Sequence, residues 1–216
     1  MSREADMRRV LDCGIVAVVR SAESAPLVDV CRALADGGVD VAEITFTVPD
    51  ALEVLKAARK ALGDRMLLGA GTVLDPETAR AAFLAGAEYI VSPTLDTEVI
   101  AMARRYGKLV MPGCFTPTEI LKAWQAGADI IKVVPAEVVG PAYFKAVRGP
   151  LPQIRMMPTG GVDLNTAASF LEAGACCLGI GSQLIDPKAV AARKFDLISE
   201  KAAKYREIIK AHRAKA

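Results

Sequence analysis

The chain has 216 residues, of which 52% are hydrophobic and 5% aromatic, and its formal net charge is +2. A chain of this length can bury a full core without disulfides or a structural metal. Nucleic-acid binders usually carry a basic stripe interleaved with aromatics, and a membrane span needs ~20 apolar residues; the sequence shows neither. The charged start MSREADMRRV also lacks the apolar core of a signal peptide. We therefore expect a cytoplasmic protein with no nucleic-acid and no membrane partner.

Short β-branched runs alternate along the chain with longer amphipathic segments. The expected strands are 14–20, 40–46, 66–70, 88–91, 108–112, 129–134, 155–159 and 176–180. Such alternation implies parallel strands with right-handed crossovers, and eight units fit a closed barrel better than an open sheet. We expect an α/β fold, a (β/α)8 TIM barrel, with an extra N-terminal helix (about 2–12) and a long C-terminal helix (about 188–213). No linker divides the chain, so a single domain over 1–216 is expected.

Lys132 stands out because it lies in a strand that is otherwise apolar, DIIKVVPAE. In a TIM barrel the active site lies at the carboxyl ends of the strands, so polar residues late in strands are the candidates. A lysine buried there costs several kcal/mol unless it is paired or neutralised. Desolvation would lower the pKa of the amine, which a Schiff-base nucleophile requires. The alternative is a structural ion pair, or a side chain that reaches solvent.

Glu43 lies in the second expected strand, VAEITF, where Val41 and Thr45 share its face. The other face is expected to meet the helices, so Glu43 points into the barrel. It is either a structural partner for Lys132 or a group that tunes the amine and transfers protons, and the two roles are compatible.

Arg20 and three glycine-rich stretches indicate an anionic ligand. Arg20 ends the first strand, where a guanidinium can bind a carboxylate in bidentate fashion. GAGTV (69–73), PTGGV (158–162) and GIGSQ (179–183) end the third, seventh and eighth strands. Glycines there let backbone N–H groups approach a ligand, and the loops after the last two strands are the usual phosphate site of barrels. We therefore expect a phosphate at strands seven and eight.

The sequence has one histidine, His212, four residues from its end. Cys/His and Ser/His/Asp nucleophile systems need an imidazole, and histidine-ligated zinc sites need several. Cys114, in the loop-like PGCFTP, is the cysteine to consider as a nucleophile, and the missing histidine argues against it. We expect no metal site.

Together these stretches resemble the 2-keto-3-deoxy-6-phosphogluconate aldolase family, class I aldolases with a Schiff-base lysine. The matching stretches recur in family order over roughly residues 10 to 185: EITFTVPD (43–50), GAGTV (69–73), VSP (91–93), MPGCFTPTE (111–119), IKVVPAE (131–137), PTGGV (158–162) and GIGS (179–182). The resemblance implies a (β/α)8 barrel, usually a homotrimer, that acts on a phosphorylated keto acid without a metal or other cofactor.

The resemblance also implies roles for single residues. Lys132 would form the Schiff base, and Glu43 would move protons through a water. Thr72 would bind the keto-acid carboxylate, and Pro93 would line the pyruvyl pocket. Thr159 would contact the sugar hydroxyls or the phosphate end. The expected phosphate ligands are Gly160, Gly161, Gly181 and Ser182.

Three departures from the family pattern concern the substrate. Some members carry a carboxylate-binding arginine where this chain has Thr47, and we expect Arg20 to take that role. The common K-F-F-P is K-V-V-P here, so an aromatic wall is missing. VVGPAYFKA (138–146) resembles phosphogalactonate-specific relatives, whereas PTGGV favours phosphogluconate, which leaves the C4 stereochemistry open.

The leading hypothesis is reversible cleavage of 2-keto-3-deoxy-6-phosphogluconate to pyruvate and glyceraldehyde 3-phosphate. The same chemistry on the galactonate epimer or on 4-hydroxy-2-oxoglutarate is the first alternative. A phosphate-binding barrel that isomerises or transfers phosphorylated metabolites without a Schiff base, and a non-catalytic trimeric scaffold, are the others.

Overall fold

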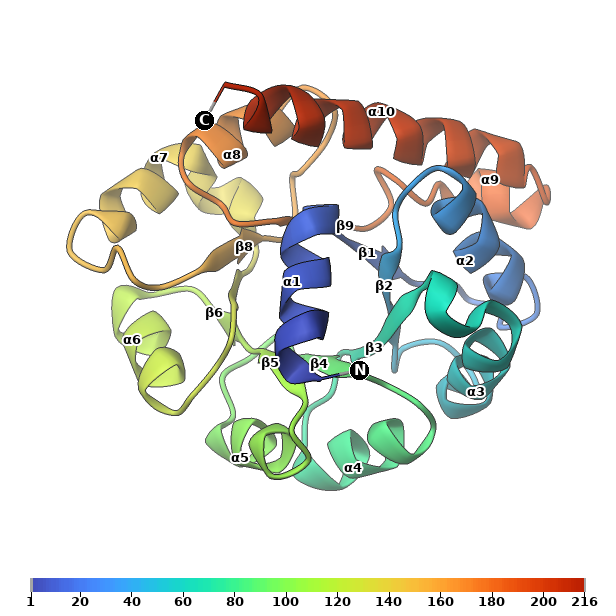
Figure 1. Ribbon diagram of the computed structural model, residues 1–216, viewed down its shortest axis with the longest axis horizontal. Coiled ribbons are helices and arrows are strands. Elements are labelled where there is room, and N and C mark those ends of the chain that lie inside the picture. Colours follow the sequence, from blue (N-terminus) through green and yellow to red (C-terminus); the bar gives the residue numbers. More distant parts are fainter. Residues whose placement is uncertain (1, 216) are drawn as a thin grey trace.

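Parallel strands curl into a barrel surrounded by helices in the computed structural model, which describes residues 2–215 (Figure 1). The strands are β1 (Ile15–Val19), β2 (Val41–Thr45), β3 (Leu67–Gly71), β4 (Tyr89–Val91), β5 (Leu109–Met111), β6 (Gly113–Cys114), β7 (Ile131–Val133), β8 (Met156–Pro158) and β9 (Leu178–Ile180). They pair in parallel in the orders β5-β4-β3-β2-β1-β9 and β6-β7-β8. The two outermost positions of the expected domain, 1 and 216, lie outside the described residues.

Two junctions turn these sheets into a ring of eight strand positions. β5 and β6 are halves of one position, interrupted at Pro112, which has no N–H to donate to a ladder. The carbonyl of Pro112 still accepts a hydrogen bond from the Lys132 N–H at 2.9 Å, so the position stays in register with β7. A parallel bridge between Thr159 and Gly179 joins β8 to β9. The predicted TIM barrel is confirmed.

Ten α-helices and one short 3-10 helix are described. They are α1 (Arg3–Cys13), α2 (Leu27–Asp36), α3 (Ala51–Leu62), η1 (Gly63–Arg65), α4 (Pro76–Leu84), α5 (Thr97–Arg105), α6 (Pro117–Gln125), α7 (Ala136–Arg148), α8 (Ala167–Glu172), α9 (Pro187–Ala191) and α10 (Phe195–Arg213). Within residues 2–215, no helix combines the length and the apolar character that crossing a bilayer demands.

The N-terminal helix α1 lies across one end of the barrel in Figure 1. Its Arg3 pairs with Asp129, ahead of β7, and its Arg9 pairs with Asp40, ahead of β2, at 2.8 Å. Both partners precede their strands, so α1 covers the amino ends of the barrel. The carboxyl ends stay free of this helix.

The predicted C-terminal helix 188–213 is wrong as a single element. The chain turns after α9, and α10 begins at Phe195. Arg193 has a φ of 53°, in the left-handed region that a helix does not use. The sequence there has neither proline nor glycine to signal the break. The long α10 itself agrees with the prediction.

The core fills the barrel and the layer beneath the helices. All five residues of β1, β2 and β3 are buried, as expected for strands covered on both faces. Among residues 2–215, a small set of polar or charged side chains is also buried: Asp6, Glu43, Thr45, Ser92 and Lys132. Glu43 and Lys132 are therefore the two charged side chains that strands carry into this core.

Candidate active site

Lys132 is the middle residue of β7, and its side chain is buried with 6% exposure. Its strand neighbours are Gly113 on β6 and Met157 on β8. Among residues 2–215, no carboxylate lies within 4.0 Å of its amine. The side chain is thus neither exposed to solvent nor held in an ion pair, which removes the two structural interpretations of this lysine.

Glu43, the middle residue of β2, is 1% exposed. Neither carboxylate oxygen has a hydrogen-bond partner within the described part of the chain. Burial raises the pKa of Glu43, while the positive charges of Lys132 and Arg20 act in the opposite direction. The structure therefore places the buried Glu43 within electrostatic reach of two positive groups, the buried Lys132 and the exposed Arg20.

Gly71, at the end of β3, makes room for the Glu43 carboxylate. A Cβ built on Gly71 would come within 2.5 Å of Glu43 Oε1, and one built on Gly69 would come within 2.3 Å of the Tyr89 ring. From the sequence, we expect these glycines of GAGTV to let a ligand come close to the backbone. The structure instead shows that they accommodate neighbouring side chains, one of which is the candidate proton-transfer group.

Thr72 directly follows β3 and has a φ of 58°. A β-branched residue in the left-handed region is strained, and such strain gathers at functional sites. The unfavourable geometry is consistent with a Thr72 that is held in place for a ligand.

Pro93 lies two residues after β4, and its backbone is packed tightly against β6. A Cβ on Gly113 would come within 2.2 Å of the Pro93 carbonyl. Gly113 is also the strand neighbour of Lys132. Pro93 therefore lies at the carboxyl end of the barrel, two strand positions from β7, with the β5/β6 position between them.

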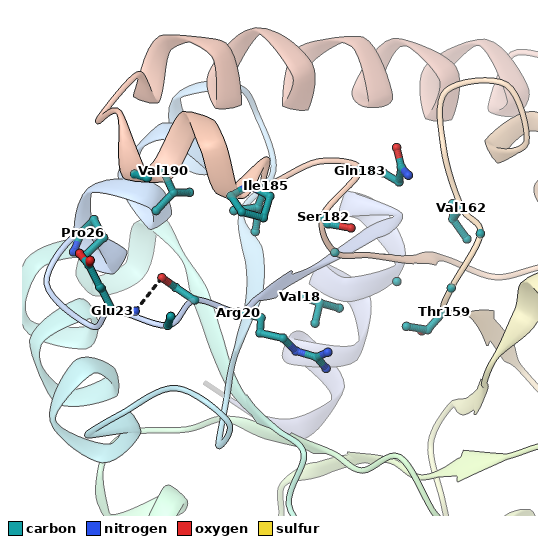
Figure 2. A pocket seen from close by; sticks show the side chains of 18 of the residues that line it. Val18, Arg20, Glu23, Pro26, Thr159, Val162, Ser182, Gln183, Ile185 and Val190 are labelled. Carbon is teal, nitrogen blue, oxygen red and sulfur yellow. Dashed lines mark hydrogen bonds between the residues drawn. The ribbon is translucent and has the colours of Figure 1, made fainter.

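A cavity of about 600 Å³ opens at the carboxyl ends of β1, β8 and β9. Figure 2 shows the Arg20 side chain extending past Val18, toward the side on which Thr159 and Ser182 lie. The predicted residues that line this cavity are Arg20, Thr159, Gly160, Gly161, Gly181 and Ser182. Lys132, Glu43, Thr72 and Pro93 are not among its lining residues. The predicted set thus divides into a buried part with Lys132 and Glu43 and an open part that lines the cavity.

Two contacts connect these parts. Val18, a lining residue, is the strand neighbour of Glu43. The N–H of Thr159 donates to the carbonyl of Val133, the residue after Lys132, at 3.0 Å. The cavity therefore begins beside the ends of the strands that carry Glu43 and Lys132.

The two glycine loops offer backbone donors to this cavity. Gly160 and Gly161 have φ values of 97° and 68°, which favour glycine. In the part of the chain that the structure describes, no hydrogen bond uses the backbone N–H of Gly161, Gly181 or Ser182. Unpaired N–H groups in loops that line a cavity are suited to an anion. Arg20 adds the positive charge of a guanidinium.

Sequence reasoning missed Glu137, which also lines this cavity. It is the first-turn acid of α7 and lies against the glycine loop: a Cβ on Gly161 would come within 2.5 Å of the Glu137 Cβ. The motif IKVVPAE contains this residue, but the contact joins positions 137 and 161, and no local pattern reveals it.

Cys114 is buried in β6, and burial raises the pKa of its thiol to about 12. The nucleophilic form of cysteine is the thiolate, so this thiol is unreactive near neutral pH. Residues 2–215 contain no group of three or more His, Cys, Asp or Glu side chains placed to hold a metal ion.

Comparison with known proteins identifies the group to which this site belongs. The family model described as KDPG and KHG aldolase matches residues 7–201. The chain belongs to the KDPG and KHG aldolase family. KDPG stands for 2-keto-3-deoxy-6-phosphogluconate and KHG for 4-hydroxy-2-oxoglutarate. The chain is a lyase of this group, with the family's TIM-barrel fold.

Three relatives show how the chain stands within the group. It is 40% identical to the 2-dehydro-3-deoxy-6-phosphogalactonate aldolase of Escherichia coli K12, over 70% of this chain and 75% of the relative. It is 38% identical to the 2-dehydro-3-deoxy-phosphogluconate aldolase of Pseudomonas aeruginosa, over 83% and 80%. A Legionella pneumophila KDPG aldolase, solved with pyruvate captured as a covalent carbinolamine, superposes with a TM-score of 0.83 at 26% identity, over 92% and 96%.

Proposed function

We propose that this protein reversibly cleaves 2-keto-3-deoxy-6-phosphogluconate to pyruvate and glyceraldehyde 3-phosphate through a Schiff base on Lys132. The observation that carries the proposal is the buried amine of Lys132, which has no ion-pair partner among residues 2–215 and lies near a carboxyl of raised pKa. The pyruvate carbinolamine in the Legionella relative supports it, since a carbinolamine forms when an amine adds to the keto carbon.

The residues present can perform each step. The Lys132 amine adds to the C2 carbonyl, and loss of water gives an iminium. Glu43, directly or through a water, removes the C4 hydroxyl proton while the C3–C4 bond breaks and its electrons enter the iminium. Glyceraldehyde 3-phosphate leaves, the resulting enamine is protonated at C3, and hydrolysis releases pyruvate and frees the amine. Thr72 and Pro93 would hold the pyruvyl half.

The phosphate would bind at the far end of the cavity, at Gly160, Gly161, Gly181 and Ser182, with Arg20 and Thr159 beside it. Arg20 lines this cavity and also acts on Glu43. Its expected role, in a chain with Thr47 where some members have an arginine, is to bind the keto-acid carboxylate.

The galactonate epimer is the second candidate substrate, because the Escherichia coli relative at 40% identity carries that name. The PTGGV motif favours the gluconate series. Turnover should be compared for the purified gluconate and galactonate substrates and for 4-hydroxy-2-oxoglutarate. We expect the gluconate substrate to have the highest kcat/KM. A higher kcat/KM for one of the other two substrates would change the specificity assigned to this chain within the family. If none of the three substrates is cleaved, a non-catalytic scaffold or an isomerase is favoured.

Substituting Gly161 with valine is expected to weaken binding of the phosphorylated substrate by at least about tenfold, the size of a lost charge-assisted hydrogen bond. A side chain there is strained at a φ of 68° and displaces the loop. The phosphate is bound in both ground and transition states, so the loss should appear mainly as affinity. Imine formation with pyruvate alone is the control. Equal losses in both assays would mean that the substitution damages the barrel.

Cleavage activity is expected to survive exhaustive EDTA treatment, because the iminium accepts the electrons that a metal ion stabilises in metal-dependent aldolases. Activity should be measured before and after dialysis against EDTA and again after addition of zinc. An activity that EDTA removes and zinc restores would contradict a Schiff-base mechanism.

The resemblance also predicts a homotrimer. Light scattering of the purified protein measures its mass directly, and a monomer or dimer would separate this chain from the family's usual assembly.

A further inference from the structure

Glu137 places a carboxylate at the inner side of the glycine loop. A Cβ on Gly160 would come within 1.9 Å of Glu137 Oε2. The backbone fixes this arrangement, since the N–H of Ala136 donates to the Thr159 carbonyl at 3.0 Å. The start of α7 is thus joined to the loop that follows β8, and Glu137 faces the cavity between the end of the Lys132 strand and the proposed phosphate loops.

The Glu137 carboxylate is exposed to solvent. Within residues 2–215 it forms no ion pair, and no hydrogen bond is found for it. The charged residues that line the cavity are Arg20, Glu23 and Glu137, so carboxylates outnumber cations there. A carboxylate beside a bound phosphate is repulsive unless it gains something from the ligand in return.

Water hydrates this exposed carboxylate in the free protein. Because an ionised carboxylate can only accept hydrogen bonds, a ligand that covers it has to supply donors in place of that water. A second unsatisfied group lies nearby: Thr159 Oγ1 is buried without a hydrogen-bond partner among the described residues. Phosphate and carboxylate groups of the substrate supply no donors when ionised. The hydroxyls between them do.

We propose that Glu137 is a specificity-determining residue for the aldehyde half of the substrate. Its carboxylate accepts a hydrogen bond from the hydroxyl on the carbon between the aldehyde carbon and the phosphate-bearing carbon. The inference rests on the proposed function and extends it, since it names the group by which the site recognises a hydroxylated aldehyde. Aldehydes that lack this hydroxyl leave the carboxylate unpaired beside the phosphate, and the site rejects them.

The synthesis direction tests this, with pyruvate as donor and two acceptors, D-glyceraldehyde 3-phosphate and 3-oxopropyl phosphate, which lacks the hydroxyl. The wild type should prefer the hydroxylated acceptor by at least about tenfold in kcat/KM. Glu137→Ala should lose at least about tenfold with that acceptor and gain activity with the other, because the variant no longer leaves a carboxylate unpaired beside the phosphate. Glu137→Gln should recover part of the preference, because its amide oxygen still accepts a hydrogen bond. Glu172→Gln, an exposed acid of α8 outside the cavity, is the matched control.

Three results would overturn the inference. Equal losses with both acceptors would assign Glu137 a structural role. Gains with both acceptors, in the Ala and Gln variants alike, would show that the carboxylate merely repels the phosphate. An unchanged preference would show no contact. Borohydride trapping of pyruvate, run on every variant, separates these from a failure of the proposed function: without a trapped adduct in the wild type, the aldolase assignment fails and this inference with it.

Discussion

Lys132→Ala is expected to lower aldol cleavage by on the order of 10⁴-fold or more, the scale seen when a covalent nucleophile is removed from an enzyme. Without the amine no iminium forms, and the C3–C4 bond has no electron acceptor. The fold should persist, because the substitution removes a buried amine that has no ion-pair partner among residues 2–215. The measurement is steady-state cleavage, with circular dichroism and thermal unfolding to confirm the fold.

Two further variants sharpen this result. Lys132→Arg keeps the charge but not the nucleophile, since a guanidinium stays protonated, and it should be as inactive as the alanine variant. Lys122→Ala removes an exposed lysine of α6 and should leave activity intact. Appreciable cleavage by Lys132→Arg would mean that the charge, not covalent chemistry, is what the site needs.

Glu43→Gln is expected to lower cleavage by at least ~10²-fold, the usual contribution of a general acid or base. The amide cannot take the C4 hydroxyl proton, whereas the pyruvate imine should still form, slowly, because the amine of Lys132 is untouched. Single-turnover cleavage and pyruvate trapping, measured on the same sample, separate the two steps. Near-normal turnover would leave Glu43 as a structural partner of the lysine.

The raised pKa of Glu43 also predicts how stability depends on pH. A carboxyl whose pKa is higher in the folded protein holds its proton more tightly there than in the unfolded chain. Its favourable contribution is therefore complete below the unfolded pKa and is lost as pH rises through the folded pKa. Glutamine does not titrate. The Tm of Glu43→Gln relative to the wild type should thus increase with pH across this interval, and a difference that stays constant would contradict a raised pKa.

The alternation of side chains along a strand was enough to predict that two side chains of the site point into the barrel. In β2 and β7 the period of two placed Glu43 and Lys132 inside the barrel, and both are buried there. The barrel itself followed from repeated βα units, because each strand is local and the closing rule is general. Such features depend on residues that are close in sequence, so they can be recognised in a single sequence.

The features that sequence reasoning missed depend on distant contacts or on unsignalled backbone angles. Gly71 is small because Glu43 of another strand needs its space, and Glu137 meets a loop more than twenty positions away. The turn at Arg193 adopts a left-handed angle without glycine. Such arrangements are set by packing in three dimensions and produce no periodic pattern in the sequence.

The most direct test of the central claim is the mass of the protein after incubation with pyruvate and borohydride, followed by peptide mapping. We expect one reduced pyruvyl group per chain, attached to Lys132, and none on Lys132→Ala. An adduct on another lysine, or trapping that persists in Lys132→Ala, would contradict the Schiff-base assignment.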